Sequence, residues 1–361
     1  MADRGRKIIQ VVKRFGLCGG MEEYVFRLVE SLTYLGYNVL VLCEEKVNLP
    51  ESCETEVIQL GIGSRKPRWY SHFQFSQKVK HWLYTEAPEN YLLHSHERIS
   101  DHHITTIHST LFNFPRKFGL PSIRKALNEK LESREINEKS TTCVVPVSQV
   151  IRNQITQKYP LSTSKLANPI NPGINRISLQ GSKKVAKDLI RIGFMGEEWK
   201  RKGLPKVIEI WRTLTKWGKH CQLVLAGFPP SEKIGLTHAE VKSVLIMGWL
   251  SDKSKFFSEI DILLHPAKRE AYGMVVAESA SLGIPFVCSN ECGASTLASE
   301  GYGKAIPESA SAESWAEKLI SLISQAPTRK CYQRPWSQVA KEYADLYEKI
   351  QPSSYRPDSM Q

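Results

Sequence analysis

Short apolar runs alternate with longer stretches of helical periodicity along most of the chain. A continuous apolar run of a few residues, bounded by turn signals, is typical of a strand buried on both faces of a parallel sheet. The runs form two series, separated by a polar stretch, and each series predicts one sheet. The predicted strands are residues 7–13, 38–43, 56–60, 91–94, 104–107 and 143–147 in the first series, and 190–195, 222–226, 244–247, 262–264 and 286–289 in the second.

The first two predicted strands are joined by a helix over residues 21–35. Tyr24, Leu28 and Leu32 recur every four residues and share one face, and Gly36 provides a helix stop. This strand–helix–strand unit, repeated along both series, predicts an α/β fold with two doubly wound Rossmann-like domains facing a cleft.

The strand–helix alternation breaks between residues 166 and 188, where prolines and Gly173 stand among polar residues. Such a stretch is typical of an interdomain linker. Near the carboxyl end, Val339, Tyr343 and Tyr347 are spaced by four and predict one more amphipathic helix. The predicted parts are an acceptor-side domain at 1–165, the linker at 166–188, a donor-binding domain at 189–334, a helix at 335–350 and a tail at 351–361.

Composition places the chain among globular proteins, with 41% hydrophobic and 24% charged residues. The eight cysteines are scattered without the spacing of a zinc site, so we expect reduced thiols and no metal. The polar start carries no secretory signal, and no apolar run approaches 18 residues, so we expect a cytoplasmic protein.

A formal net charge of +12 favours anionic partners. No nucleic-acid-binding motif is present, so we expect no nucleic acid and favour a membrane surface or an anionic glycolipid. Basic and aromatic residues mix at 65–82 and at 112–118, which suits peripheral contact with an anionic membrane on its cytoplasmic face. The second segment is the stronger candidate, because residues 73–84 are equally compatible with a helix packed on the sheet.

The loop after the first strand reads RFGLCGGMEE, with Gly19 and Gly20 opening the helix. Paired glycines let the backbone approach a phosphate or a sugar beside the positive end of the helix dipole. The dinucleotide motif G-x-G-x-x-G is not met, since Cys18 replaces its second glycine. A tight turn that binds nothing is the alternative.

Residues 261–289 (DILLHPAKREAYGMVVAESASLGIPFVCS) combine a strand, a loop with Glu270 and a helix opened by Gly273. The free amides of Met274 and Val275 at that helix start suit a diphosphate, and Glu278 lies eight positions after Glu270. The two carboxylates are then placed to bind hydroxyl groups. Solvated surface charge is the alternative for an isolated pair of glutamates.

Two other elements follow strands and are expected at the ligand-binding edge of a sheet. Arg201 and Lys202, in WKRKGL at 199–204, can neutralise a diphosphate, with a charged helix start as the alternative. His108 follows the strand at 104–107. Nearby histidines at 94, 96, 102 and 103 raise the possibility of a metal site, but their spacing crosses several elements rather than one helix face.

These motifs resemble glycosyltransferase family 4, whose GT-B fold consists of two Rossmann-like domains. Glu270 to Glu278 resembles the family's E-x7-E signature, WKRKGL its donor-phosphate element and Gly19–Gly20 its first-loop glycine pair. The likeness spans nearly the whole chain and, within the family, is greatest to the lipopolysaccharide core glucosyltransferases. One departure is Glu197, which stands where the family often has an arginine.

The resemblance implies a role for each matching residue. Glu278 would bind the donor ribose, Glu270 the hydroxyls of the transferred hexose, and the amides of Met274 and Val275 the diphosphate. Lys202, with Arg201, would stabilise the leaving phosphate, and His108 would orient a donor or acceptor hydroxyl. The resemblance also implies a nucleotide-diphosphate sugar (UDP-glucose or a similar UDP-hexose) as co-substrate, a glycan or glycolipid acceptor, retention of anomeric configuration, and no cofactor or metal.

Three other functions stay open at this point. A nucleotide-sugar epimerase can share the fold and the donor site, and it would need no acceptor. A nicotinamide-dependent oxidoreductase has only the Rossmann-like alternation in its favour. A sugar-binding protein without catalytic activity would bind the nucleotide sugar and never turn it over.

Overall fold

The computed structural model describes residues 5–350 except 112–122, 180–188, 230–233 and 325–329. The chain divides into two compact units. Unit 1 comprises Met1–Gly173 together with Arg334–Gln361, and unit 2 comprises Ile174–Gln333. The chain thus leaves unit 1 once and returns to it with its last helix.

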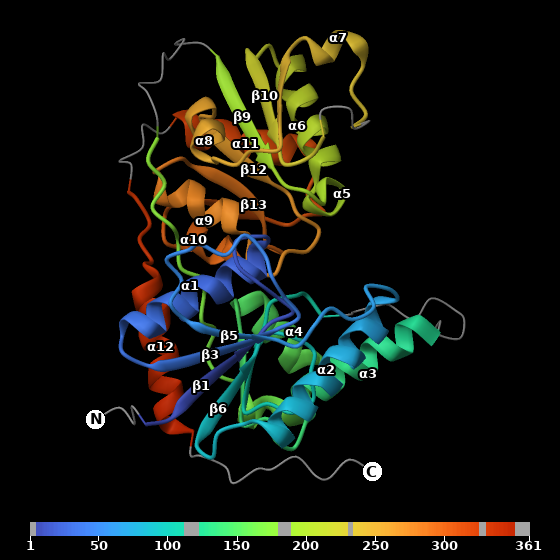
Figure 1. Ribbon diagram of the computed structural model, residues 1–361. Coiled ribbons are helices and arrows are strands. Elements are labelled where there is room, and N and C mark those ends of the chain that lie inside the picture. The colour runs from blue at the N-terminus through green and yellow to red at the C-terminus, as the bar shows by residue number, and fades with distance from the viewer. Residues whose placement is uncertain (1–4, 112–122, 180–188, 230–233, 325–329, 351–361) are drawn as a thin grey trace. The chain divides into compact units, whose positions relative to one another are not determined.

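Unit 1 is built on a six-stranded parallel sheet of order β5-β3-β1-β6-β7-β8, with helices packed on it (Figure 1). Its central strands are buried along nearly their whole length, as expected of a parallel sheet covered by helices. The strands are β1 (Lys7–Val11), β3 (Asn38–Cys43), β5 (Glu56–Gln59), β6 (Tyr91–Ser95), β7 (Ile104–Ile107) and β8 (Cys143–Pro146); the small pair β2 (Arg14–Phe15) and β4 (Glu45–Lys46) lies beside them. The helices are α1 (Gly20–Tyr34), α2 (Arg68–Thr85), α3 (Ile123–Asn137), α4 (Gln149–Lys158), the 3₁₀ turn η1 (Pro160–Lys165) and α12 (Trp336–Lys349).

Unit 2 repeats this topology, with the parallel order β11-β10-β9-β12-β13-β14. Its strands are β9 (Ile190–Met195), β10 (Cys221–Ala226), β11 (Val244–Gly248), β12 (Ile262–His265), β13 (Phe286–Ser289) and β14 (Gly303–Ile306). Its helices are α5 (Trp199–Lys202), α6 (Leu204–Lys216), α7 (His238–Val241), α8 (Ser254–Glu259), α9 (Met274–Ser281), η2 (Gly293–Ser295), α10 (Thr296–Ser299) and α11 (Ala312–Ser324).

In both sheets the strand order reverses at the middle, between β1 and β6 and between β9 and β12. Open α/β sheets bind ligands outside the carboxyl ends of their strands at such a reversal, because the two flanking connections run to opposite faces and leave a crevice. The topology therefore selects the loops after β1 and β6 in unit 1, and after β9 and β12 in unit 2, as the places to look for a site.

Helix α12 completes the core of unit 1. Its Val339, Tyr343 and Tyr347 are buried in the same apolar cluster as the inner residues of β1 and α1. Trp336, at the start of the helix, lies so close to Gly173 that a β-carbon added to this glycine would come within 2.6 Å of the indole. The amphipathic spacing of α12 predicted a helix with one apolar face, and the structure shows that this face belongs to unit 1.

The predicted strands agree with the structure to within one or two residues at each end. Strand β14 was missed because GKAI is short and contains an exposed lysine, so it has no apolar run. Two short strands, β2 and β4, were missed for the same reason of length.

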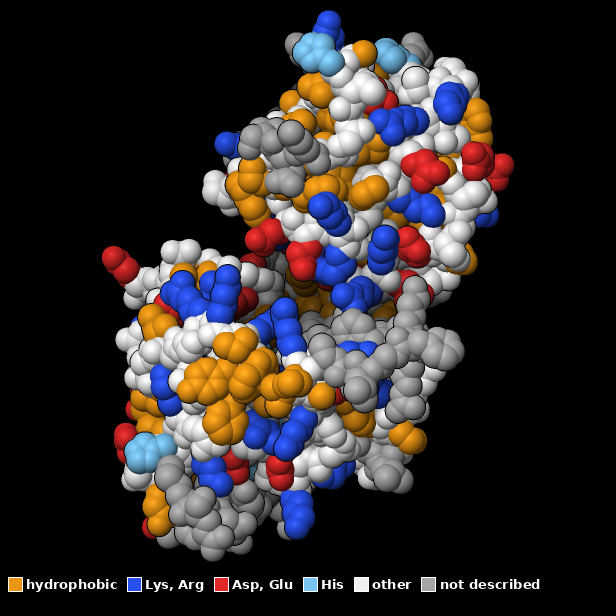
Figure 2. Space-filling view, turned by 90° about the vertical axis from the view of Figure 1, so that its right-hand side faces the viewer, with side chains coloured by type: hydrophobic (Ala, Val, Ile, Leu, Met, Phe, Trp, Pro, Cys, Tyr) orange, Lys and Arg blue, Asp and Glu red, His pale blue; other side chains and the backbone are white. Residues whose placement is uncertain are grey.

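Helix α2 covers most of the first basic and aromatic segment. Phe75, Val79 and Trp82 are buried against the sheet, while Phe73 and Tyr84 are exposed. Figure 2 shows hydrophobic side chains gathered among lysines and arginines on one face of this unit. The segment at 112–118 lies outside the described residues. No described helix combines the length and the apolar character needed to cross a bilayer.

Candidate functional site

The first βα loop of unit 1 leads into α1 through the predicted glycine pair. Gly19 is the N-cap of α1, and no side chain caps the helix there. A β-carbon on Gly19 would lie 2.4 Å from a carboxylate oxygen of Glu22, which forms an ion pair with Arg14 at 2.7 Å, whereas Gly20 has open space around it. The small residue at position 19 therefore leaves room for the Arg14–Glu22 pair and keeps the amino end of α1 accessible.

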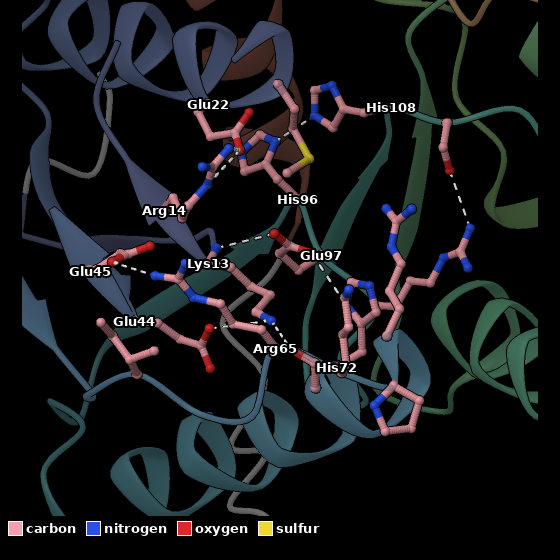
Figure 3. A pocket seen from close by; sticks show the side chains of 18 of the residues that line it. Lys13, Arg14, Glu22, Glu44, Glu45, Arg65, His72, His96, Glu97 and His108 are labelled. Carbon is pink, nitrogen blue, oxygen red and sulfur yellow. Dashed lines mark hydrogen bonds and ion pairs between the residues drawn. The ribbon is translucent and has the colours of Figure 1, made fainter. Parts of the chain in front are cut away.

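A pocket of about 1220 Å³ opens at the topological reversal of unit 1 (Figure 3). The loops after β1 and β6 contribute to its wall, together with the start of α2 and the end of β7, as the topology requires. The lining includes positively charged side chains, negatively charged side chains and three histidines. The charged and histidine residues are Lys13, Arg14, Glu22, Glu44, Glu45, Arg65, Lys66, Arg68, His72, His96, Glu97, Arg98, His108, Arg124 and Glu135.

Lysine and arginine outnumber glutamate in this pocket, and several of the charges are paired. Ion pairs join Lys13 to Glu44 at 3.2 Å and Arg14 to Glu22 at 2.7 Å, with looser contacts from Arg65 to Glu45 at 3.8 Å and from Arg98 to Glu135 at 3.6 Å. Within the described part of the chain, three lining cations form no ion pair, which leaves the pocket with a positive excess. They are Lys66, Arg68 and Arg124.

Two buried carboxylates increase this excess further. Burial raises the pKa of Glu97 to about 7, against the lowering effect of the backbone N–H and the charge of Lys13. Burial likewise raises the pKa of Glu135 to about 7, although Arg98 opposes the shift. Near neutral pH both carboxyl groups are partly protonated, so the pocket prefers anionic or neutral polar ligands to cations.

His108 lies at the end of β7 and lines the pocket, as the sequence analysis expected of a residue in this position. Its Nε2 is 2.9 Å from Nδ1 of His96, and its ring packs edge-on against Tyr24. Burial lowers the pKa of His108 to about 3, so the imidazole is neutral. Among the described residues, no group of three or more His, Cys, Asp or Glu side chains is placed to hold a metal ion.

In unit 2, the predicted basic element forms α5, directly after β9. The carbonyl oxygen of Arg201 accepts a hydrogen bond of 3.0 Å from the N–H of Lys268, which ties α5 to the loop after β12. The Lys202 side chain lies along Gly196, where a β-carbon would be 2.3 Å from it. Lys202 has no partner for its ammonium group in the described part of the chain, and it is therefore available to a ligand.

Gly203 holds α5 against the β12 loop. Its φ of +91° is left-handed, and a β-carbon there would lie 2.0 Å from the carbonyl oxygen of Pro266. We expect Gly203→Ala to lower the free energy of unfolding by at least about 3 kcal/mol, since backbone strain costs roughly 1–3 kcal/mol and the clash adds to it. Chemical denaturation measures the loss.

Gly218→Ala is the matched control for this substitution. Gly218 also has a positive φ, +75°, but nothing lies within 4 Å of the added β-carbon. The Gly218→Ala variant should lose only the part of the free energy of unfolding that comes from backbone strain. Equal losses for both variants would show that the close approach to Pro266 contributes nothing to stability.

Glu270 lies in the loop after β12 and contacts α5, which belongs to the connection after β9. Its carboxylate is 3.2 Å from the Arg201 guanidinium and 3.8 Å from Nε2 of His265. Burial opposes ionisation, but His265, Lys202 and Arg201 outweigh it and lower the pKa of Glu270 to about 2. Glu270 is therefore ionised, and groups from the connections after β9 and β12 fix the position of its carboxylate.

Arg201 is itself held by several acceptors. Its guanidinium donates to Glu198 at 2.6 and 2.8 Å, to the backbone carbonyl of Arg269 at 2.6 Å and to Glu270 at 3.2 Å. These bonds direct Arg201 toward Glu270 and leave Lys202 as the freer of the two cations. Glu197, at the position of the family's frequent arginine, is exposed.

Gly273 opens α9 beside Glu270. Its φ of +94° is left-handed, and a β-carbon there would lie 2.5 Å from Sγ of Cys292. No side chain caps the helix. The first amides of α9, those of Met274 and Val275, have no acceptor within the helix, so they present N–H donors and the positive end of the helix dipole.

Glu278 lies on the second turn of α9 and is only 5% exposed. One carboxylate oxygen pairs with Nζ of Lys253 at 2.6 Å. The other, Oε2, is buried and has no hydrogen-bonding partner among the described residues. A buried carboxylate oxygen without a donor is costly unless a ligand or a water supplies one, so this atom is a candidate for a hydrogen bond from a ligand.

The structure groups Arg201, Lys202, Glu270 and Gly273 at the reversal of unit 2, with Glu278 on the same helix as the free amides. Gly19, Gly20 and His108 belong to unit 1. Sequence reasoning missed Lys253, which precedes a short helix and carries no local signal. It also missed Lys13 and Glu97, although both follow strands at the reversal of unit 1 and the topology rule could have found them.

Two family models match consecutive parts of the chain. "Glycosyltransferase Family 4" matches residues 18–175, and "Glycosyl transferases group 1" matches residues 176–334. The chain is a glycosyltransferase that combines a Family 4 region with a group 1 region. Glu270 and Glu278 of this glycosyltransferase lie in the second matched region, and Gly19 and Gly20 lie in the first. The two matched regions meet at residues 175 and 176, close to the boundary between unit 1 and unit 2 after Gly173.

The glycosyltransferase is similar to the lipopolysaccharide glucosyltransferase WaaG of Escherichia coli (strain K12), with 31% identity over 160 residues. That match spans 42% of this chain and 41% of the relative's own length. A crystal structure of WaaG, described as a glycosyltransferase involved in lipopolysaccharide biosynthesis, has a TM-score of 0.72 at 20% identity and covers 94% of this chain and 95% of that chain.

A second solved structure is Anabaena Alr3699/HepE in complex with UDP and glucose. It has a TM-score of 0.67 at 14% identity and covers 96% of this glycosyltransferase and 100% of that chain. At these identities the solved structures show the shared GT-B fold.

Proposed function

We propose that this glycosyltransferase moves a hexose from a nucleotide-diphosphate sugar to a glycan or glycolipid acceptor, with retention of anomeric configuration. The observation that carries the proposal is the arrangement in unit 2. A free lysine, two uncapped amides and a charge-held carboxylate meet at the topological reversal, and a second carboxylate has one buried oxygen without a donor. A diphosphate joined to a ribose and a sugar supplies a partner of the right kind to each of these groups.

The donor would bind through groups of opposite character. Lys202 and the amides of Met274 and Val275 suit the diphosphate, since all three present positive charge or N–H donors. Oε2 of Glu278 suits a ribose hydroxyl, which can donate the hydrogen bond that this oxygen lacks. Glu270 suits the hydroxyls of the hexose, and Arg201 and His265 keep it ionised and oriented. A UDP-hexose such as UDP-glucose is the proposed donor, supported by the ligands named for the Anabaena structure.

In the proposed reaction the bond from the anomeric carbon to the diphosphate oxygen breaks, and the acceptor oxygen bonds to the same face of that carbon. The acceptor proton passes to the departing phosphate oxygen. Lys202 stabilises the negative charge that develops on the phosphate, which is often the largest catalytic contribution. The ion pair with Arg201 favours a binding role for Glu270 over a covalent one, since it reduces the nucleophilicity of the carboxylate.

For the acceptor we propose the pocket of unit 1 and, as its ligand, an acidic glycan of the lipopolysaccharide core. The positive excess of the lining supports an acidic ligand, and His108 there suits a hydroxyl group. A glycolipid acceptor would place the enzyme at the cytoplasmic face of the membrane. The exposed Phe73 and Tyr84 of α2, a helix that also contains Lys78 and Lys80, support peripheral contact there.

The test is a panel of UDP-, GDP- and ADP-hexoses, with binding measured by calorimetry and slow hydrolysis measured by released nucleotide. We expect one nucleotide sugar to bind and to be hydrolysed slowly without acceptor, and a lipopolysaccharide core acceptor to accelerate its consumption. Conversion of the free nucleotide sugar to its epimer would instead identify an epimerase. Binding of none of the panel would contradict the assignment of Glu270 and Glu278 to a donor site.

Glu278→Ala separates donor binding from stability. We expect nucleotide-sugar affinity to fall by about 10–100-fold, the value of a hydrogen bond to a charged group. The unfolding midpoint should change little, because the substitution also removes a buried oxygen without a donor, and Lys253 is half-exposed and can be solvated. Calorimetric titration and thermal unfolding measure the two quantities. Glu317→Ala on the exposed face of α11 is the control and should alter neither.

A further inference from the structure

A chain of buried hydrogen bonds connects the last helix of the protein to the pocket of unit 1. Nε2 of Gln10 donates to the hydroxyl of Tyr347 at 3.0 Å, and Oε1 of Gln10 lies 2.8 Å from Nε2 of His96. Nδ1 of His96 then lies 2.9 Å from Nε2 of His108. Figure 3 shows the last of these bonds, between His96 and His108. Gln10, His96 and Tyr347 are buried, and the pocket is lined by His96 and by the more exposed His108.

The far end of this chain is anchored by a second branch. The Tyr347 hydroxyl is 2.7 Å from Nδ1 of His94, and Nε2 of His94 is 2.7 Å from the Thr106 hydroxyl. Thr106 continues to Tyr343 at 2.8 Å, and Tyr343 to Tyr24 at 2.8 Å. These side chains come from β6, β7, α1 and α12, so the network is assembled only when the last helix packs on unit 1.

The orientation of Gln10 determines which nitrogens of His96 and His108 carry a hydrogen. Because its amide nitrogen donates to Tyr347, its carbonyl oxygen faces His96 and can only accept, so Nε2 of His96 carries a hydrogen. In a neutral imidazole only one nitrogen is protonated, so Nδ1 of His96 accepts and Nε2 of His108 donates. Burial lowers the pKa of both histidines far enough to keep them neutral. Nδ1 of His108 then has no hydrogen.

We propose that Gln10, His96 and Tyr347 are positioning residues that fix the tautomer of His108, so that it presents a bare Nδ1 to the pocket as an acceptor for a substrate hydroxyl. This nitrogen has no hydrogen-bonding partner among the described residues. It would favour a hydroxyl donor at this point and disfavour a carboxylate or phosphate oxygen, which has no hydrogen to offer. The identity of that hydroxyl as part of a sugar rests on the proposed function; the tautomer does not.

Nitrogen NMR of the full-length protein, labelled with ¹⁵N-histidine, tests the tautomer directly at pH 7.5. His108→Gln identifies the signals of His108 by their loss. We expect Nε2 of His108 at the shift of a protonated imidazole nitrogen and Nδ1 at that of an unprotonated one. The opposite pattern, with the hydrogen on Nδ1, would overturn the proposal.

Variants then test the role of the chain. Gln10→Met keeps the length of the side chain but removes both hydrogen bonds, and Tyr347→Phe removes the group that orients the Gln10 amide. Both should move the two His108 signals toward each other, as the tautomers mix. Tyr159→Phe, which removes a partly buried hydroxyl bonded to Glu132 elsewhere in unit 1, is the control and should leave the His108 signals unchanged.

The remaining histidine signals report whether each variant is folded, and the wild-type spectrum alone already decides the tautomer. Unchanged His108 signals in a folded Gln10→Met protein would refute control by Gln10. Because no step of this test measures transfer, the confirmed tautomer in a protein that binds no nucleotide sugar would refute the proposed function and leave the assignment of Gln10 and His96 standing.

Discussion

Glu270→Ala is expected to lower kcat/KM for sugar transfer by about 10²–10³-fold, the usual result of removing one group that stabilises a transition state electrostatically. The carboxylate is held as an anion by His265, Lys202 and Arg201, with its pKa lowered to about 2. Its removal deletes the proposed acceptor for the hexose hydroxyls and one of the two carboxylates that pair with Arg201. Steady-state kinetics with the nucleotide sugar from the panel measures the loss.

Glu270→Gln distinguishes the role of the charge from that of the shape. Glutamine keeps an acceptor oxygen at the same distance but no longer attracts Arg201 and Lys202. We expect a loss smaller than that of the alanine variant. The exposed Glu317→Ala is the control for removing a glutamate from unit 2. Transfer by Glu270→Ala at the wild-type rate would exclude this carboxylate from the site.

Acid should unfold unit 1 well before unit 2. Burial lowers the pKa of a group of histidines in unit 1 below the usual 6.5, so that the unfolded chain binds protons there that the folded unit does not. The stability that these histidines contribute is present above pH 6.5 and is lost as the pH falls below it, by about 1.4 kcal/mol per pH unit for each histidine. They are His72, His94, His96, His102, His103 and His108.

Two carboxylates of the same unit act in the opposite direction. The pKa values of Glu97 and Glu135 are raised by burial to about 7, so their contribution to stability grows as the pH falls from 7 toward 4.5. They offset about two of the histidines. The remaining difference lowers the free energy of unfolding of unit 1 by about 5 kcal/mol per pH unit below 6.5, which is comparable to the total stability of many domains.

Differential scanning calorimetry at pH 7.5, 6.5 and 5.5 measures this effect. The transition of unit 1 should move to lower temperature much more than that of unit 2, where His265 is the described histidine with a lowered pKa. His103→Asn keeps an acceptor for the N–H of Leu93 and removes one titrating group, so it should reduce the pH dependence by about one proton. Equal acid shifts of both transitions would contradict the prediction.

Local sequence patterns determined the elements of this protein and drew attention to the carboxylates Glu270 and Glu278. Apolar runs predicted the longer strands because a doubly covered parallel strand must be apolar over its length. The spacing of Glu270, Gly273 and Glu278 predicted a strand, a loop and a helix start, and α9 begins as expected. These features depend on neighbours within about ten residues, so one chain read in order contains them.

Other features were decided only by tertiary structure. Helix α12 is amphipathic in sequence, but its burial in unit 1 depends on contacts such as Gln10 to Tyr347, which are 337 residues apart. The anion at Glu270 depends on Arg201, 69 residues earlier, and the pairing of Glu278 depends on Lys253. The pocket of unit 1 and the tautomer of His108 likewise arise where several strands end together. Packing brings these groups within hydrogen-bonding distance. The periodicity of a sequence reflects local structure, so it does not indicate which distant residues will be in contact.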